Sequence, residues 1–171
     1  MKRIACSALF FLSLSACGSD TTTTPAAAQA KPAPAPAESP KEPANADMDA
    51  AVKVLMAKPE WPEENIEIQH ILIAFQGAPR MSGITRSKDE AKVLAQKVYA
   101  EAIGGGDFDA LVKQYTNDSS PGIYAVSKAS RTRWVKGFGD VGFRLKVGEI
   151  GVSPWDEKAS PFGWHIIKRV K

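Results

Sequence analysis

The sequence is poor in the side chains that bind metal ions. Its 171 residues include only two cysteines and two histidines, which nearly excludes a zinc site built from several such ligands. The zinc-protease motif H-E-x-x-H and the nucleophile elbow G-x-S-x-G of serine hydrolases are both missing from the sequence. We therefore expect no metal, no cofactor and no hydrolase chemistry.

The sequence also lacks a strong net charge and a long apolar run. A formal charge of +3 is too small to indicate binding to nucleic acid. The longest apolar run extends from Ile4 to Ala16 and is shorter than the about 20 residues of a membrane-spanning helix. A basic start, Met1-Lys2-Arg3, precedes this run, and that combination is typical of a secretory signal peptide. We expect no transmembrane helix.

The apolar run ends in the letters LSAC, with the cysteine at Cys17. This ending resembles the bacterial lipobox, in which the cysteine is lipidated and becomes the mature N-terminus. The alternative is an ordinary signal peptide that is cleaved near Ala16. We predict a signal peptide at residues 1–16 and a lipid anchor of several chains on Cys17, which holds firmly to a membrane. Gly18 replaces the Asp that signals inner-membrane retention, so we expect the periplasmic face of the outer membrane.

The next segment is rich in proline and alanine and has no aromatic residue. It holds six of the 12 prolines between Gly18 and Ala46, and such a composition does not bury enough surface to offset the entropy of ordering. We predict that residues 17–47 form a lipidated tether. Residues 48–63 are predicted to add a short helix, which either docks on the domain or frays. Residues 64–171 remain as one small domain.

The pattern of residues 64–171 predicts an α+β fold, with a small, mostly antiparallel sheet surrounded by helices. Two segments have apolar groups on both faces by period 2, as a central strand does. The capping box at Ser87 and the glycines at 104–106 delimit a helix, and Asp107 caps the next one. The predicted elements, in order, are a strand at 66–75, helices at 87–104 and 107–115, a weak helix at 137–145, and strands at 150–153 and 163–170.

Five segments in this order resemble the parvulin-type peptidyl-prolyl cis/trans isomerases, also called rotamases. They are HILI (70–73), the helix with its glycine turn, GDFDALVKQYTNDSS (106–120), FRLKVGEIG (143–151) and SPFGWHIIK (160–168). The resemblance covers residues 66–171. It implies a parvulin/FKBP-like fold and an enzyme that accelerates rotation about X–Pro bonds, whose barrier is about 18–20 kcal/mol.

The resemblance implies a catalytic group of His70, Asp118 and His165. The two histidines either orient the site or simply link two strands as buried, hydrogen-bonded side chains. Asp118 either alters the polarisation of the substrate amide or caps the turn after a helix.

The resemblance also implies a set of substrate-binding residues. Phe138 matches the aromatic residue of the proline-ring pocket, and Trp134 stands where the family usually has Met. Phe162 is expected to border the site, although ordinary core packing is the alternative for each aromatic residue. Ser160 takes a position where a Thr hydroxyl commonly bonds to the histidines. Arg80 and Arg86 lie in a basic loop at 77–88, where phosphate-directed parvulins have a basic cluster. The two arginines either select an acidic residue before the proline of the substrate or are simply solvated.

One departure from the family pattern leaves two functions open. Residues 121–126 read PGIYAV and lack the Gly-Gly-Asp-Leu-Gly loop of many parvulins, so the wall of the pocket is expected to differ there. The first function is isomerisation of X–Pro bonds in extracytoplasmic polypeptides, which assists folding. The alternative is a non-catalytic peptide-binding chaperone or scaffold. The expected partners are unfolded or partly folded proline-containing polypeptides and, through Cys17, a membrane; we expect a monomer that binds no nucleic acid.

Overall fold

The computed structural model describes residues 47–171. The predicted signal peptide, Cys17 and nearly all of the tether lie outside the described residues. The helices are α1 (Met48–Met56), α2 (Lys88–Ile103), α3 (Phe108–Tyr115) and α4 (Lys136–Gly142), with one 3₁₀ turn, η1 (Arg131–Arg133). The strands are β1 (Asn65–Ile73), β2 (Ile123–Ser127), β3 (Ile150–Ser153) and β4 (Trp164–Arg169). Among residues 47–171, none of the helices has both the length and the apolar character to cross a bilayer.

The four strands form one antiparallel sheet in the order β2-β1-β4-β3. The predicted central position of β1 is confirmed, because β2 and β4 flank it. The strand β2 is not among the elements predicted from the sequence. This strand has five residues and lies at the sheet edge, where most of its side chains are exposed or only half-buried, so it lacks the apolar run that identified β1 and β4.

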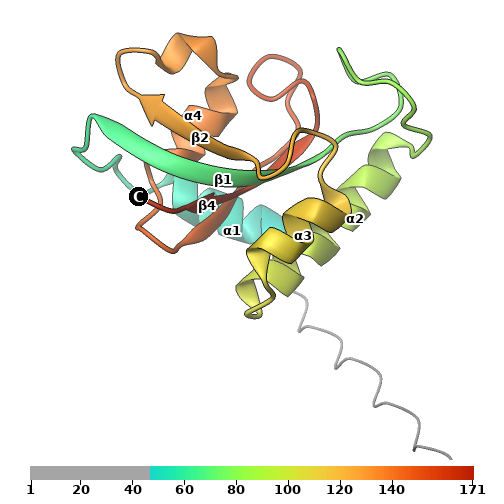
Figure 1. Ribbon diagram of the computed structural model, residues 1–171, viewed down its shortest axis with the longest axis horizontal. Coiled ribbons are helices and arrows are strands. Elements are labelled where there is room, and N and C mark those ends of the chain that lie inside the picture. The colour runs from blue at the N-terminus through green and yellow to red at the C-terminus, as the bar shows by residue number, and fades with distance from the viewer. Residues whose placement is uncertain (1–46) are drawn as a thin grey trace, which may run out of the picture. The chain divides into compact units, whose positions relative to one another are not determined.

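Both faces of the sheet are covered, which explains the apolar side chains on both faces of β1. Figure 1 shows α2 and α3 on the lower side of the sheet and α4 on the upper side. Ile71 and Ile73 belong to the cluster of buried residues that includes α2 and α3. Ile66 and Ile68 belong to the other cluster, with Phe138 of α4. The predicted α+β architecture is therefore confirmed.

The helix boundaries follow the capping residues read from the sequence. Ser87 Oγ accepts a hydrogen bond from the Glu90 amide at 3.2 Å, and the Glu90 carboxylate accepts one from the Ser87 amide at 2.7 Å. Asp107 caps α3 by accepting from the amide of Asp109 at 3.0 Å. Such caps pair amide groups that the first helical turn leaves without partners.

Residues 48–63 dock on the domain rather than fray. In α1, Met48 is completely buried and Leu55 is nearly so. In the segment after α1, Glu60 forms ion pairs with Arg131 at 2.7 Å and with Arg144 at 2.9 Å. Helical spacing predicts that the apolar Val52, Leu55 and Met56 lie near one face, and this prediction is partly wrong, because Met56 is exposed. Its position near Leu55 in the sequence does not indicate which side of the helix meets the sheet.

Candidate active site

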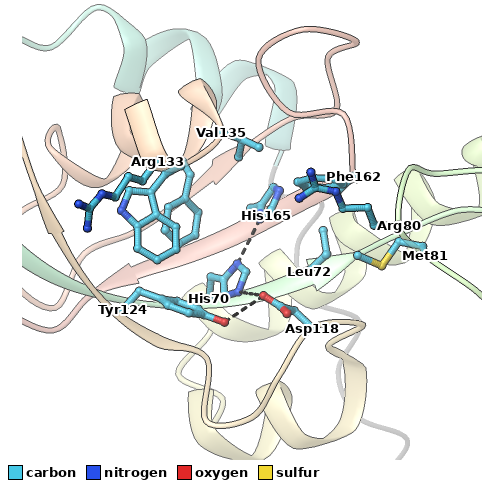
Figure 2. Close-up of a pocket in the computed structure, with 12 residues that line it drawn as sticks. His70, Leu72, Arg80, Met81, Asp118, Tyr124, Arg133, Val135, Phe162 and His165 are labelled. Carbon is cyan, nitrogen blue, oxygen red and sulfur yellow. Dashed lines mark hydrogen bonds and ion pairs between the residues drawn. The ribbon is translucent and has the colours of Figure 1, made fainter. Parts of the chain in front are cut away.

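A cavity of about 410 Å³ lies beside the sheet between β1, β4, α4 and the loops that follow β1 and α3. Figure 2 shows the side chains that line it. Seven of the nine residues predicted from the sequence are among them: His70, Arg80, Asp118, Trp134, Phe138, Phe162 and His165. The fold therefore brings together residues that are up to 95 positions apart in the chain.

The two histidines occupy diagonal positions on neighbouring strands. His70 is opposite Ile167, and Leu72 is opposite His165, in the β1–β4 ladder. Side chains two residues apart on a strand point to the same face, so both imidazoles reach the cavity. Their rings stack with centroids 5.3 Å apart, and the two Nδ1 atoms are 3.1 Å apart.

Asp118 is placed by a segment that is tied to β1. The amide of Asn117 donates to the Leu72 carbonyl at 2.8 Å, and its side-chain oxygen accepts from the Ala74 amide at 2.9 Å. These bonds bring the next residue, Asp118, to β1, where its Oδ2 lies 3.0 Å from His70 Nε2.

The hydrogen bond from His70 is the largest of the effects that hold the pKa of Asp118 well below its ordinary value. Partial burial opposes that shift, and a bond from Tyr124 adds to it. Asp118 is therefore an ionised acceptor at neutral pH.

This charge fixes the protons on the histidine pair. A carboxylate only accepts hydrogen bonds, so His70 Nε2 must carry a proton. In a neutral His70, Nδ1 then accepts, and the proton between the rings belongs to His165 Nδ1. The remaining nitrogen, His165 Nε2, is buried without a partner among the described residues. Burial, assisted by the neighbouring His70, lowers the pKa of His165 to about 3. The arrangement suits an orienting pair better than a pair that exchanges protons.

A pH dependence of stability follows from the buried His165. Its pKa falls from an ordinary 6.5 to about 3 on folding, so between these values the unfolded chain binds the extra proton and stability falls as pH falls. His70 and Asp118 are the titratable groups that face it. We expect the free energy of unfolding to decrease by about 2 kcal/mol from about pH 7 to about pH 5. Urea unfolding at both values measures it. In the variant His165→Gln, whose side chain does not titrate, most of this difference in the free energy of unfolding should disappear. An unchanged difference would show that His165 is not the cause of the pH dependence.

Aromatic rings form one wall of the cavity. Phe138 packs edge-on against His70, with centroids 5.0 Å apart, and lies 5.6 Å from Trp134. Phe138 is only 2% exposed. It therefore belongs to the core as well as to the cavity wall, and the two interpretations of this residue overlap.

Two predicted site residues do not line the cavity. Ser160 is fully buried, and its hydroxyl donates to the Gly163 carbonyl at 3.1 Å; within residues 47–171 it makes no bond to either histidine. Arg86 donates to the Ala74 carbonyl at 3.1 Å and to the Asn117 side chain at 2.7 Å. Its guanidinium braces the segment that carries Asp118 and does not line the cavity.

Several residues that line the cavity were not predicted from the sequence: Leu72, Met81, Tyr124, Arg133 and Val135. Tyr124 comes from β2, and the alternation in IYAVS after the Pro-Gly turn was the available signal for that strand. Arg133 lies in a stretch without the apolar periodicity of a helix or a strand, so no pattern in the sequence indicated it. Within the described part of the chain, no group of three or more His, Cys, Asp or Glu side chains is arranged to hold a metal ion.

Comparisons with known proteins agree with this geometry. The family model described as the PPIC-type PPIASE domain matches residues 52–171. The chain is 30% identical over 107 residues to Chaperone SurA of Pseudomonas fluorescens, an alignment that covers 61% of this chain and 22% of that protein. It is 26% identical over 113 residues to Foldase protein PrsA 1 of Lactobacillus johnsonii, covering 64% of this chain and 32% of that protein. The chain thus aligns with a third or less of these relatives.

Two solved structures share the fold. The solution structure of TbPIN1 matches with a TM-score of 0.52 and 24% identity, over 64% of this chain and 99% of that one. Peptidyl-prolyl isomerase ESS1 from Candida albicans matches with a TM-score of 0.55 and 22% identity, over 72% of this chain and 73% of that one. These likenesses support the α+β fold described above.

Proposed function

Because the chain belongs to the PPIC-type peptidyl-prolyl isomerase (parvulin) family, we propose that it catalyses cis/trans exchange at X–Pro bonds of extracytoplasmic polypeptides and so assists their folding. One observation carries the proposal: His165, His70 and Asp118 form a hydrogen-bonded row in one cavity. The relatives named as a chaperone and a foldase are consistent with polypeptide clients.

The proposed catalysis works on the resonance of the amide. A planar X–Pro amide places negative charge on its oxygen, and that resonance maintains the barrier to rotation. The carboxylate of Asp118, held beside the carbonyl oxygen, disfavours this charge and so favours the twisted state. The proline ring lies against Phe138 and Trp134. An acceleration of ~10⁵-fold corresponds to about 7 kcal/mol of differential stabilisation, and preorganised groups in a partly dry cavity are the means by which proteins supply it.

The organisation of the whole chain is also a proposal. Residues 1–16 are removed as a signal peptide, Cys17 carries the lipid, and residues 17–47 tether the isomerase domain at 64–171 through the docked segment 48–63. Support comes from the LSAC letters and from the proline-rich composition. The location that we propose is the periplasmic face of the outer membrane.

The second candidate, a peptide-binding chaperone without turnover, is favoured by the altered segment at 121–126 and by the burial of Phe138. Two-dimensional exchange NMR on short X–Pro peptides separates the two candidates. Cross-peaks that grow with added protein would support the isomerase. Shift changes in the peptide without faster exchange at high protein concentration would reject it in favour of the binder.

The same peptides test a preference for an acidic residue before proline. Arg80 and Arg133 both line the cavity, and Figure 2 shows them on opposite sides of the site. Both are exposed, so screening by solvent limits the effect. We expect kcat/KM to be about threefold higher for Glu-Pro than for Lys-Pro peptides at low salt, and Arg80→Gln to reduce the ratio. An equal rate for both peptides would contradict this preference.

A further inference from the structure

The hydroxyl of Tyr124 lies on the carboxylate that the proposed mechanism uses. Tyr124 Oη donates to Asp118 Oδ2 at 3.1 Å, and Ser119 Oγ lies 2.8 Å from the same phenol oxygen. A phenol has a single proton. While that proton is shared with Asp118, the Ser119 hydroxyl must donate to Tyr124. Figure 2 shows Tyr124 and His70 directed at Asp118 from β2 and β1.

Two rows of donors therefore converge on one oxygen. One runs from His165 through His70, and the other runs from Ser119 through Tyr124. A single hydrogen bond leaves a carboxylate free to rotate about its side-chain torsions, whereas two donors from different strands fix it. Asp118 needs this restraint, because its side chain is 39% exposed in the connection between α3 and β2.

The ring of Tyr124 is itself held in place. It packs edge-on against His70 with centroids 5.3 Å apart and against Trp134 at 5.1 Å. The chain is anchored two residues before Tyr124, because the Gly122 carbonyl accepts a hydrogen bond from the His70 amide at 2.9 Å. A Cβ at Gly122 would lie 2.7 Å from the His70 carbonyl oxygen, at a φ of +67°. Only glycine suits this turn, which brings Tyr124 back over Asp118.

We propose that Tyr124 is a positioning residue for X–Pro isomerisation, acting by fixing Asp118 Oδ2 opposite His70. The inference rests on the proposed function. The backbone of Ser119 also hydrogen-bonds to this carboxylate. The segment 121–126, which departs from the family's Gly-Gly-Asp-Leu-Gly loop, adds the Tyr124 hydroxyl as a second side-chain donor beside His70.

Tyr124→Phe tests the proposal, since it removes the donor and keeps the ring. We expect kcat to fall about tenfold with little change in KM, as for the loss of one hydrogen bond to a charged group. The second readout does not need activity. Three-bond couplings to the Asp118 carboxyl carbon should report one side-chain rotamer in the wild-type chain and an average of rotamers in the variant. Tyr115→Phe is the matched control, because Tyr115 does not line the cavity, and it should change neither readout.

The two readouts separate the inference from the proposed function. If Asp118 keeps one rotamer in Tyr124→Phe, the positioning role is overturned, whatever the rates show. If the wild-type chain does not accelerate exchange, the proposed function fails, while the couplings still decide whether Tyr124 fixes Asp118. Unchanged kcat in an active enzyme would also overturn the inference.

Discussion

Asp118→Ala is expected to lower kcat/KM for X–Pro exchange by about 10²–10³-fold, the usual loss when a preorganised electrostatic group is removed from an active site. The carboxylate is ionised because the hydrogen bond from His70, first among its causes, holds the pKa of Asp118 low. Exchange NMR on a Glu-Pro peptide measures the rate. Stability should fall by only about 1 kcal/mol at neutral pH, because the Asp118 side chain is 39% exposed and solvent screens its bond to His70.

Asp109→Ala provides the matched control. Asp109 accepts a hydrogen bond of 2.7 Å from Gln69, the β1 residue next to His70, yet it does not line the cavity. Its loss should cost a similar amount of stability, about 1 kcal/mol, and leave turnover unchanged. If Asp118→Ala reduced turnover no more than Asp109→Ala does, Asp118 would be a structural cap on the turn after α3. Its role in catalysis would then be withdrawn.

The parts of the site that lie on buried strands were predictable from the sequence. In β1 and β4 the alternation of apolar residues predicts the strands that carry His70 and His165, and the resemblance to the parvulins pairs the two histidines in one site. The resemblance to the parvulins then named Asp118 and Phe138. All four line one cavity, although their roles in catalysis stay predictions.

The parts that depend on contacts between distant segments were not predictable. The loop that holds Arg86 also holds Arg80, and nothing in their spacing shows that one guanidinium turns inward to Asn117 while the other lines the cavity. Ser160 is similar, because a hydroxyl bonds to whichever acceptor the fold brings near, and here it is the Gly163 carbonyl. Tyr124 was missed because β2 is short and half-exposed, so its sequence resembles that of a loop.

Gly163→Ala should be the most destabilising of the changes considered, with a loss of about 4 kcal/mol in the free energy of unfolding. Gly163 has a φ of +147°, and a Cβ there would lie 2.1 Å from the Ile73 carbonyl oxygen and 3.0 Å from the Ala74 Cα. These are backbone atoms at the end of the central strand, so they cannot move without disturbing the β1–β4 ladder that carries both histidines. Since small domains are stable by about 5–15 kcal/mol, this loss would remove a large share of the stability.

Gly148→Ala separates the two causes of this loss. Gly148 also has a positive φ, +84°, but a Cβ there would meet nothing within 4 Å. Its replacement by alanine should cost only the strain of a side chain at a positive φ, about 1 kcal/mol in the free energy of unfolding. Urea unfolding of both variants, followed by tryptophan fluorescence, measures the difference. We expect a loss of about 4 kcal/mol at Gly163 and about 1 kcal/mol at Gly148. The difference between the two losses would then be due to the close approach of β4 to β1. Equal losses at the two positions would show that the approach of the backbones does not constrain residue 163.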